Sequence, residues 1–184
     1  AIYKEGQYKV SEKSIIKPKS IYGKTKIRAE KQIKKFAKKN KINYGILRYF
    51  NIAGSSPSGK IGLINKKSDH LFKNFSIELM KKNPKLKIYG TDYKTKDGSC
   101  IRDFIHVSDI ADIHTTAANT LFKNFVSDIY NCGYGQGYSV KQVITEMENI
   151  INDKLKVEIG PRREKDISVS IANSDKFKKK FNWK

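Results

Sequence analysis

The chain has 184 residues, of which 38% are hydrophobic and 30% are charged. It is the size of one ordinary domain, or of a large piece of a bigger one, with enough apolar residues to form a core. No apolar run approaches the roughly 18 residues that a membrane span requires, so we predict no membrane partner. The first residues show no signal-peptide pattern, and because the chain does not begin with Met we expect upstream sequence to be missing.

The net charge of +20 at pH 7 raises the question of a nucleic-acid partner. Such an interface would gather basic residues on one stripe and would use arginine to read bases. Here the lysines are spread along the whole chain and arginine is scarce. We therefore predict a solvated, lysine-rich surface that attracts anionic ligands in general, and no nucleic-acid partner.

The two cysteines, Cys100 and Cys132, lie far apart in the sequence and have no metal-ligand spacing. We expect two free thiols in a reducing compartment, which predicts a cytoplasmic location and no metal site.

Hydrophobic periodicity predicts an alternation of helices and strands. The expected helices cover residues 20–40, 69–82, 108–122 and 140–152. The expected strands cover residues 45–50, 85–89, 128–132 and 156–159. Residues 51–59 have the composition of a loop at a strand end, and Ser139 with Gln142 forms a capping-box pattern before the last helix. This alternation predicts an α/β fold with a largely parallel sheet.

Tyr22 and Lys26 form a Tyr-x-x-x-Lys pair on the first expected helix. Residues four apart share one face of a helix, so the ammonium can lie near the phenol and stabilise the phenolate, which makes the phenol a better general base. The spacing alone is weak support, because the chain has ten tyrosines and is rich in lysine.

The most distinctive stretch is residues 90–107, where polar, turn-prone residues end in Arg102 and an alternating apolar segment follows. Its pattern, G-x-D-Y followed by R-D-F-I-H-V, resembles the signature of UDP-galactose/UDP-glucose 4-epimerases in the extended short-chain dehydrogenase/reductase family. Three further segments resemble this family in the same order: residues 18–30, which surround the Tyr-Lys pair, 48–51 and 162–166. Thr25 stands where the family usually has serine.

The resemblance implies a role for each matched position. Tyr22 would be the catalytic base that takes the proton from the sugar 4-hydroxyl, and Lys26 would hold the nicotinamide ribose of a retained NAD. Phe50 would lie beside the cofactor. The residues expected to bind the UDP-sugar are Asn51, His70, Leu71, Lys87, Ile88, Tyr89, Arg102, Arg163, Asp166 and Ser170. Taken alone, Asn51 would be interpreted as a turn residue and Arg102 as part of a surface ion pair.

Within that set, the two arginines are expected to bind the diphosphate, and Asp166 to accept hydrogen bonds from the ribose hydroxyls. Ser170 matches a family position that faces the sugar and restricts the pocket when it is a bulky tyrosine. Because serine is small, the resemblance implies that N-acetylated UDP-hexoses are accepted as well as UDP-glucose and UDP-galactose.

The resemblance also implies that parts are missing. The glycine-rich turn that approaches the cofactor diphosphate is absent, as is the Ser/Thr that partners the tyrosine, and Lys4 stands where glycine is usual. The chain resembles the C-terminal part of an epimerase. Residues 1–60 would be the end of the Rossmann-type NAD-binding domain, and 61–184 would mainly form a smaller α/β substrate domain with segments that return to the Rossmann sheet. We expect the isolated chain to have poor stability and little or no activity.

The implied activity is 4-epimerisation of a UDP-hexose through a 4-keto intermediate, by an enzyme that is a homodimer when full length. The alternatives are another extended short-chain enzyme, either a uronate 4-epimerase or a 4,6-dehydratase, an inactive fragment, and a basic binding module. The glycine-rich residues 133–137 look like a phosphate loop, but in the resembling proteins they form a turn before a helix.

Overall fold

The computed structural model describes residues 1–65, 68–123, 126–164 and 166–183. Its helices are α1 (Ile21–Asn40), α2 (Leu71–Leu79), α3 (Val107–Lys123), α4 (Val140–Ile151) and α5 (Asp175–Phe181). Its strands are β1 (Gly45–Tyr49), β2 (Asn51–Ala53), β3 (Lys85–Tyr89), β4 (Ile101–Arg102), β5 (Phe104–His106), β6 (Asp128–Cys132), β7 (Tyr138–Ser139), β8 (Lys156–Gly160) and β9 (Val169–Ser170).

Every helix and strand expected from the sequence is present, with small shifts at the ends, and the capping box at Ser139 is formed. The loop prediction was wrong for residues 51–53, which form β2 because β5 pairs with them in parallel. The sequence did not predict α5 or the short strands β4, β5, β7 and β9. These strands depend on partners that lie far away in the sequence.

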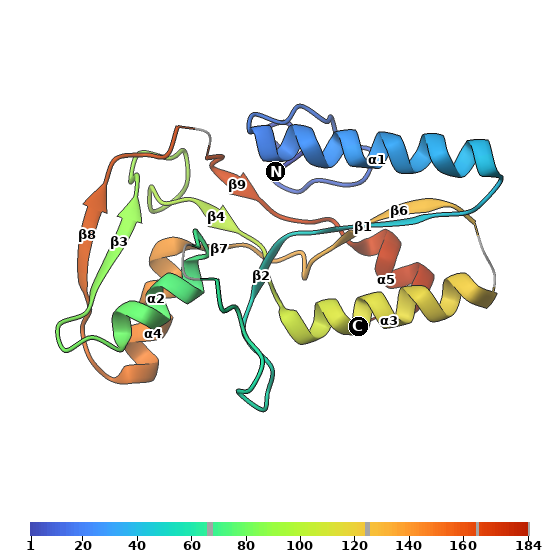
Figure 1. Ribbon diagram of the computed structural model, residues 1–184. Coiled ribbons are helices and arrows are strands. Elements are labelled where there is room, and N and C mark those ends of the chain that lie inside the picture. The colour runs from blue at the N-terminus through green and yellow to red at the C-terminus, as the bar shows by residue number, and fades with distance from the viewer. Residues whose placement is uncertain (66–67, 124–125, 165, 184) are drawn as a thin grey trace.

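One part of the molecule is built on the parallel pair β1–β6. In Figure 1, α1 covers one face of this pair, and α3 and α5 cover the other. The core on the α3 and α5 side includes Ile105, Ile113 and Phe177, all fully buried. Figure 1 also shows that β1 runs back toward the start of α1, so the first turn of α1 and the end of β1 lie at the same end of this part. Ligands of parallel α/β sheets bind at the carboxyl ends of the strands.

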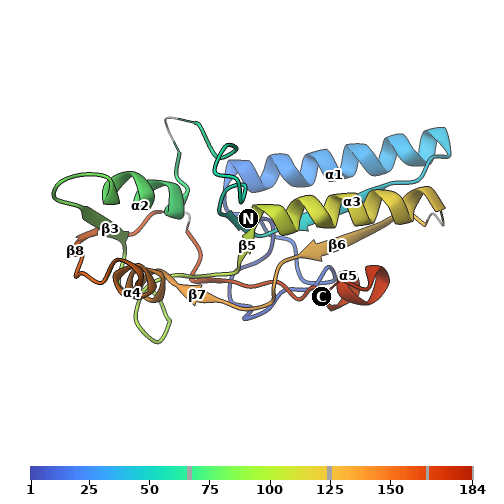
Figure 2. The same cartoon turned by 90° about the horizontal axis from the view of Figure 1, so that it is seen from below.

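The other part contains the parallel pair β3–β8 together with α2 and α4, which lie on the opposite side of Figure 2 from α1, α3 and α5. Its core packs Phe75 of α2, Leu86 and Ile88 of β3, and Val143 of α4. The predicted α/β class is confirmed, although the strands pair in several short sheets and β7 joins β4 in antiparallel fashion.

Asp103 lies where the chain passes from one part to the other, between β4, which pairs with β7 and β9, and β5, which pairs with β2. Its carboxylate is fully buried and accepts hydrogen bonds from the backbone N–H groups of Tyr134 (3.1 Å), Gly135 (2.9 Å) and Ala172 (3.1 Å). Asp103 thereby joins its own segment to two distant ones, residues 134–135 and Ala172.

Candidate functional site

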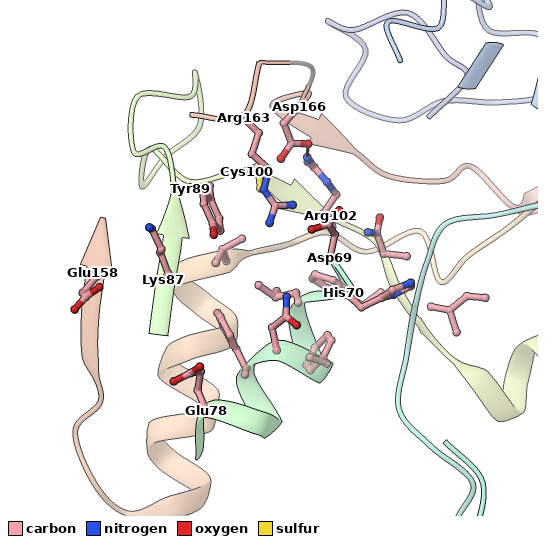
Figure 3. Close-up of a pocket in the computed structure, with 18 of the residues that line it drawn as sticks. Asp69, His70, Glu78, Lys87, Tyr89, Cys100, Arg102, Glu158, Arg163 and Asp166 are labelled. Carbon is pink, nitrogen blue, oxygen red and sulfur yellow. Dashed lines mark hydrogen bonds and ion pairs between the residues drawn. The ribbon is translucent and has the colours of Figure 1, made fainter. Parts of the chain in front are cut away.

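A cavity of about 700 Å³ lies between α2, β3 and β4, and we call it the larger cavity. It is lined by Asn51, Ile52, Asp69, His70, Leu71, Phe72, Asn74, Phe75, Glu78, Lys85, Lys87, Tyr89, Cys100, Arg102, Phe104, Val140, Glu158, Arg163 and Asp166. In Figure 3, Arg102 and Asp166 lie at one end of it and Glu78 of α2 lies at the other. The lining is mixed, with four cationic side chains, four carboxylates and several apolar side chains, three of them from α2.

A smaller cavity of about 250 Å³ adjoins the larger one. It is lined by Ala1, Tyr3, Lys19, Ser20, Asn51, Arg102, Asp166, Ile167 and Ser170. Asn51, Arg102 and Asp166 line both cavities, so a ligand that spans the two would pass these three side chains.

Arg102 is held in place by several contacts. One guanidinium nitrogen, Nη2, is paired with the carboxylate of Asp166, and Nη1 donates to the backbone carbonyl of Ile101 at 2.8 Å. The Arg102 side chain is only 10% exposed. Its ion pair with Asp166 therefore differs from the surface ion pair that Arg102, taken alone, was compatible with. A fixed planar fork of this kind suits the oxygens of a phosphate group.

Two cationic side chains lie near the ring of Tyr89 at the mouth of the larger cavity. The guanidinium carbon of Arg163 is 4.3 Å from the ring centroid, and Nζ of Lys87 is 5.5 Å from it. Lys87 and Tyr89 project from the same face of β3, because side chains two apart on a strand share a face. Ile88, between them, points into the core and lines neither cavity.

The Tyr22–Lys26 pair has the predicted local geometry but lies outside both cavities. Nζ of Lys26 is 5.1 Å from the centroid of the Tyr22 ring, and Tyr22 is 60% exposed. Ser20 caps the helix by accepting from the N–H of Gly23 at 3.0 Å, which sets the start of α1 next to the smaller cavity. Phe50 also lies outside the cavities, where it packs against Ile2, Tyr3 and Val10.

Both cavities contain residues that sequence reasoning did not identify. The apolar positions of α2 had a recognisable signal, since residues three apart, such as Phe72 and Phe75, share one face of a helix. Cys100 and Lys19 had no such signal, because their place in the cavities depends on contacts between distant segments. Burial raises the pKa of the Cys100 thiol, which disfavours its reactive thiolate form.

Within the described ranges, no group of His, Cys, Asp and Glu side chains is arranged to hold a metal ion. Likewise, no helix in the described part of the chain is both long enough and apolar enough to cross a membrane. The two cysteines are free and buried.

Known proteins resemble this chain closely in sequence. The UDP-glucose 4-epimerase of Azospirillum brasilense is 37% identical over 166 residues, a match that covers 90% of this chain and 48% of that protein. The UDP-glucose 4-epimerase of Halalkalibacterium halodurans is 38% identical, with 90% of this chain and 50% of that protein covered. The chain therefore spans about half the length of the relatives it matches.

Solved structures resemble it as well. A UDP-glucose-4-epimerase from Stenotrophomonas maltophila, with bound NAD and formylated UDP-arabinopyranose, superposes with a TM-score of 0.92 at 31% identity, over 100% of this chain and 55% of that one. The UDP-Glc/GlcNAc 4-epimerase of Campylobacter jejuni gives a TM-score of 0.74 at 39% identity, over 98% of this chain and 55% of that one. The sequence pattern of the NAD dependent epimerase/dehydratase family matches residues 1–133. This match covers most of the chain, and the chain belongs to that family.

Proposed function

We propose that this chain is the part of a UDP-hexose 4-epimerase that binds the UDP-sugar and supplies the catalytic Tyr22 and Lys26. The observation that carries the proposal is the pair of adjoining cavities that share Asn51, Arg102 and Asp166. A diphosphate at this junction would leave room for a nucleoside in the larger cavity and for a hexose in the smaller one.

The nucleotide end is assigned to the larger cavity. Arg102 and Arg163 would bind the diphosphate oxygens, and the net charge of +20 of the whole chain would attract an anionic ligand. Asp166 would accept from the ribose hydroxyls. The uracil would lie along β3, against the side chains of Lys87 and Tyr89 and the main chain of Ile88. His70 and Leu71 at the start of α2 would close the opposite side, and Asn51 would donate to the diphosphate from the start of β2.

The chemical end is assigned to the first turn of α1. Tyr22 would take the proton from the sugar 4-hydroxyl, and Lys26 would stabilise the phenolate and hold the nicotinamide ribose. The start of α1 and Phe50 lie at the carboxyl end of the β1–β6 pair, which is the place where a dinucleotide fits such a sheet. NAD, when bound, would supply reversible hydride transfer at C4, so that the sugar passes through a 4-keto form. We assign residues 1–60 and the segments that pack on β1 to the NAD-binding part, and the rest to the substrate part.

The size of Ser170 extends the proposal to N-acetylated sugars. Ser170 lines the smaller cavity, where a hydroxymethyl side chain leaves space that a bulky residue would fill. The structurally similar Campylobacter jejuni protein is named as a UDP-Glc/GlcNAc 4-epimerase, which supports this extension. Related enzymes on other nucleotide sugars, such as a uronate 4-epimerase, remain the second candidate, because their chemistry would use the same Tyr-Lys pair.

The proposal is tested in two steps. The first is calorimetric titration of the isolated chain with UDP, since the proposed UDP-binding residues all lie in this chain. The second uses a joined protein, in which the N-terminal half of the Azospirillum brasilense relative precedes this chain. The joined protein is incubated with UDP-galactose and, separately, with UDP-N-acetylgalactosamine, and the products are resolved by chromatography.

We expect the joined protein to convert both sugars and its Tyr22→Phe variant to convert neither. Ser170→Tyr should keep the conversion of UDP-galactose and lose that of the N-acetylated sugar. Conversion of UDP-galactose alone by the parent would reject the extension to N-acetylated sugars. A folded joined protein that binds NAD and UDP but converts neither sugar would reject the 4-epimerase proposal in favour of another nucleotide sugar.

We further propose that the whole enzyme is a cytoplasmic homodimer that uses no nucleic-acid partner. Free, buried thiols support a reducing compartment. Sedimentation equilibrium of the joined protein would test the dimer, because a monomer at micromolar concentration would contradict it.

A further inference from the structure

Arg48 lies near the end of β1 in a buried hydrogen-bonded group that we call the Arg48 cluster, made of Arg48, Glu30, Tyr3 and Asn131. The guanidinium donates to both carboxylate oxygens of Glu30, from Nε at 2.8 Å and from Nη2 at 2.6 Å. Its third nitrogen, Nη1, donates to the hydroxyl of Tyr3 at 2.9 Å. That hydroxyl in turn donates to Oδ1 of Asn131 at 2.5 Å, and Asn131 is the partner of Arg48 in the β1–β6 register.

The ion pair at the centre of the cluster is largely buried. The side chains of Arg48 and Glu30 are 8% and 12% exposed. Burial pushes the pKa of Arg48 down, but its hydrogen bonds to Glu30 and Tyr3 outweigh burial and hold that pKa above its ordinary value. Arg48 and Glu30 therefore form a bidentate ion pair, and loss of either partner would leave a buried charge uncompensated.

Three members of the cluster belong to segments that carry part of the proposed site. Glu30 is on α1, two helical turns after Tyr22. Arg48 is on β1, which leads directly into Asn51. Tyr3 is in the N-terminal segment and itself lines the smaller cavity. One guanidinium thus links the catalytic helix, the strand that ends at the site and one wall of the smaller cavity.

Few other contacts fix α1 in the described part of the chain, apart from Ile27, which packs half-buried against the cluster of Ile2, Tyr3 and Val10. The only buried residues of α1 are Gly23 and Ala37. The hydrogen of Gly23 and the methyl group of Ala37 are too small to interlock with the strand beneath, so they resist rotation or sliding of the helix weakly. The bidentate pair between Glu30 and Arg48 resists both, because a guanidinium fork accepts a carboxylate in one plane and at one distance.

We propose that Arg48 is a positioning residue that fixes the rotation and axial position of α1, and with them the placement of Tyr22 and Lys26 relative to Asn51. The catalytic meaning of this placement rests on the proposed function. The anchoring of the helix can be measured without any enzymatic activity. The proposed role of Arg48 and the proposed function can therefore be contradicted separately.

The first experiment measures backbone amide hydrogen exchange in the chain itself. In Arg48→Met we expect exchange in α1, around residues 24–34, to accelerate roughly tenfold or more while exchange in α3 stays within about twofold of the parent. Because α3 packs on the other face of the same strands, it is an internal control for overall loss of stability. Lys154→Met, which removes a cation from an exposed ion pair with Glu148, should leave α1 unchanged.

Two further variants guard against failure of Arg48→Met to fold. Glu30→Gln keeps the shape of the partner and a neutral hydrogen bond, so it should produce the same local effect in α1 to a smaller degree. Arg48→Lys keeps the charge but cannot reach Glu30 with two nitrogens and Tyr3 with a third, so it should fall between the parent and Arg48→Met. Equal acceleration in α1 and α3 in Glu30→Gln, or no acceleration in α1, would overturn the proposal.

The second experiment uses the joined protein. Arg48→Lys should lower kcat for UDP-galactose by roughly 10- to 100-fold, because a small misplacement of a catalytic group is costly, while KM stays within about twofold. The affinity for UDP should not change, since the larger cavity contains no member of the Arg48 cluster. An equal loss of kcat and of UDP affinity would mean that Arg48 is needed only for general stability. If the parent joined protein were inactive, the exchange experiment would still decide whether Arg48 anchors α1.

Discussion

The guanidinium of Arg102 is paired with the carboxylate of Asp166, and both side chains line the larger and the smaller cavity. In the proposed function, this pair would lie where a UDP-sugar changes from nucleotide to hexose. We expect Arg102 to keep this orientation when an anion binds, because Nη1 also donates to the carbonyl of Ile101.

We expect Arg102→Met to weaken UDP binding to the isolated chain by at least roughly tenfold, because a buried charged donor is lost and Asp166 is left unpaired beside the ligand. Isothermal titration with UDP measures this. Lys94→Met, which removes a cation from the turn before β4 without touching either cavity, is the matched control and should have little effect. Equal losses in the two variants would mean that only overall charge attracts the nucleotide.

Asp103→Asn should lower the free energy of unfolding by about 2–4 kcal/mol. The amide keeps one acceptor but turns an NH₂ group toward backbone N–H donors that the carboxylate now satisfies. Urea unfolding followed by circular dichroism gives the difference. Asp153→Asn, at an exposed site, is expected to cost less than about 0.5 kcal/mol.

Asp97 should make the protein sensitive to acid. Burial raises the pKa of this carboxyl, but hydrogen bonds from Ser139 and Ser99 outweigh burial and lower the pKa below its ordinary value. A carboxyl whose pKa is lower in the folded than in the unfolded state stabilises the fold above the unfolded pKa, and this contribution is lost as the pH falls through the folded pKa.

Asp97→Asn should therefore be less stable than the parent at pH 7, and the difference should shrink between about pH 5 and pH 3. Urea unfolding at a series of pH values measures this. Asp112→Asn on the exposed side of α3 is the control. A difference for Asp97→Asn that is constant with pH would show that hydrogen bonding alone, and not ionisation, is responsible.

Gly54 follows β2 with a φ of +86°, and a Cβ atom there would lie 2.2 Å from Nε2 of His106. Gly59, in the same loop, has a φ of +69° but open space around it. We expect Gly59→Ala to cost about 1 kcal/mol through backbone strain alone, and Gly54→Ala to cost roughly 2 kcal/mol more because the His106 ring must move. Thermal unfolding of the two variants compares them, and equal costs would contradict the close approach of His106.

The regular elements could be predicted because their signals are local. The helix now seen as α1 has a capping serine and helical periodicity. β3 alternates lysine with apolar residues, and β6 is a short segment that contains Ile129, Tyr130 and Cys132. By contrast, β2 was expected to be loop because its composition is that of a turn. It becomes a strand only when β5, about fifty residues later, pairs with it.

The candidate site follows the same division. The motifs identified Arg102, Arg163 and Asp166, which the fold brings to one cavity, whereas nothing local marked Cys100 or Lys19 as lining residues. Alternation along β3 would have indicated that Ile88 points away from Lys87 and Tyr89. Any contact between Ile88 and a ligand in the larger cavity would therefore come from its backbone. The roles of all these residues, and of Tyr22, Lys26 and Phe50, stay predictions.

The place of Asp103 has a mechanical consequence. A hinge between the two parts of the molecule would need connecting segments whose backbone can turn freely, and one of the connections between them runs through this residue. Its carboxylate accepts hydrogen bonds from two separate stretches of backbone, Tyr134 with Gly135 and Ala172, so bending there would break several buried hydrogen bonds at once. We therefore expect the two parts to tumble as a rigid unit. A ligand would then enter through movement of surface loops and not through a hinged opening between the two parts.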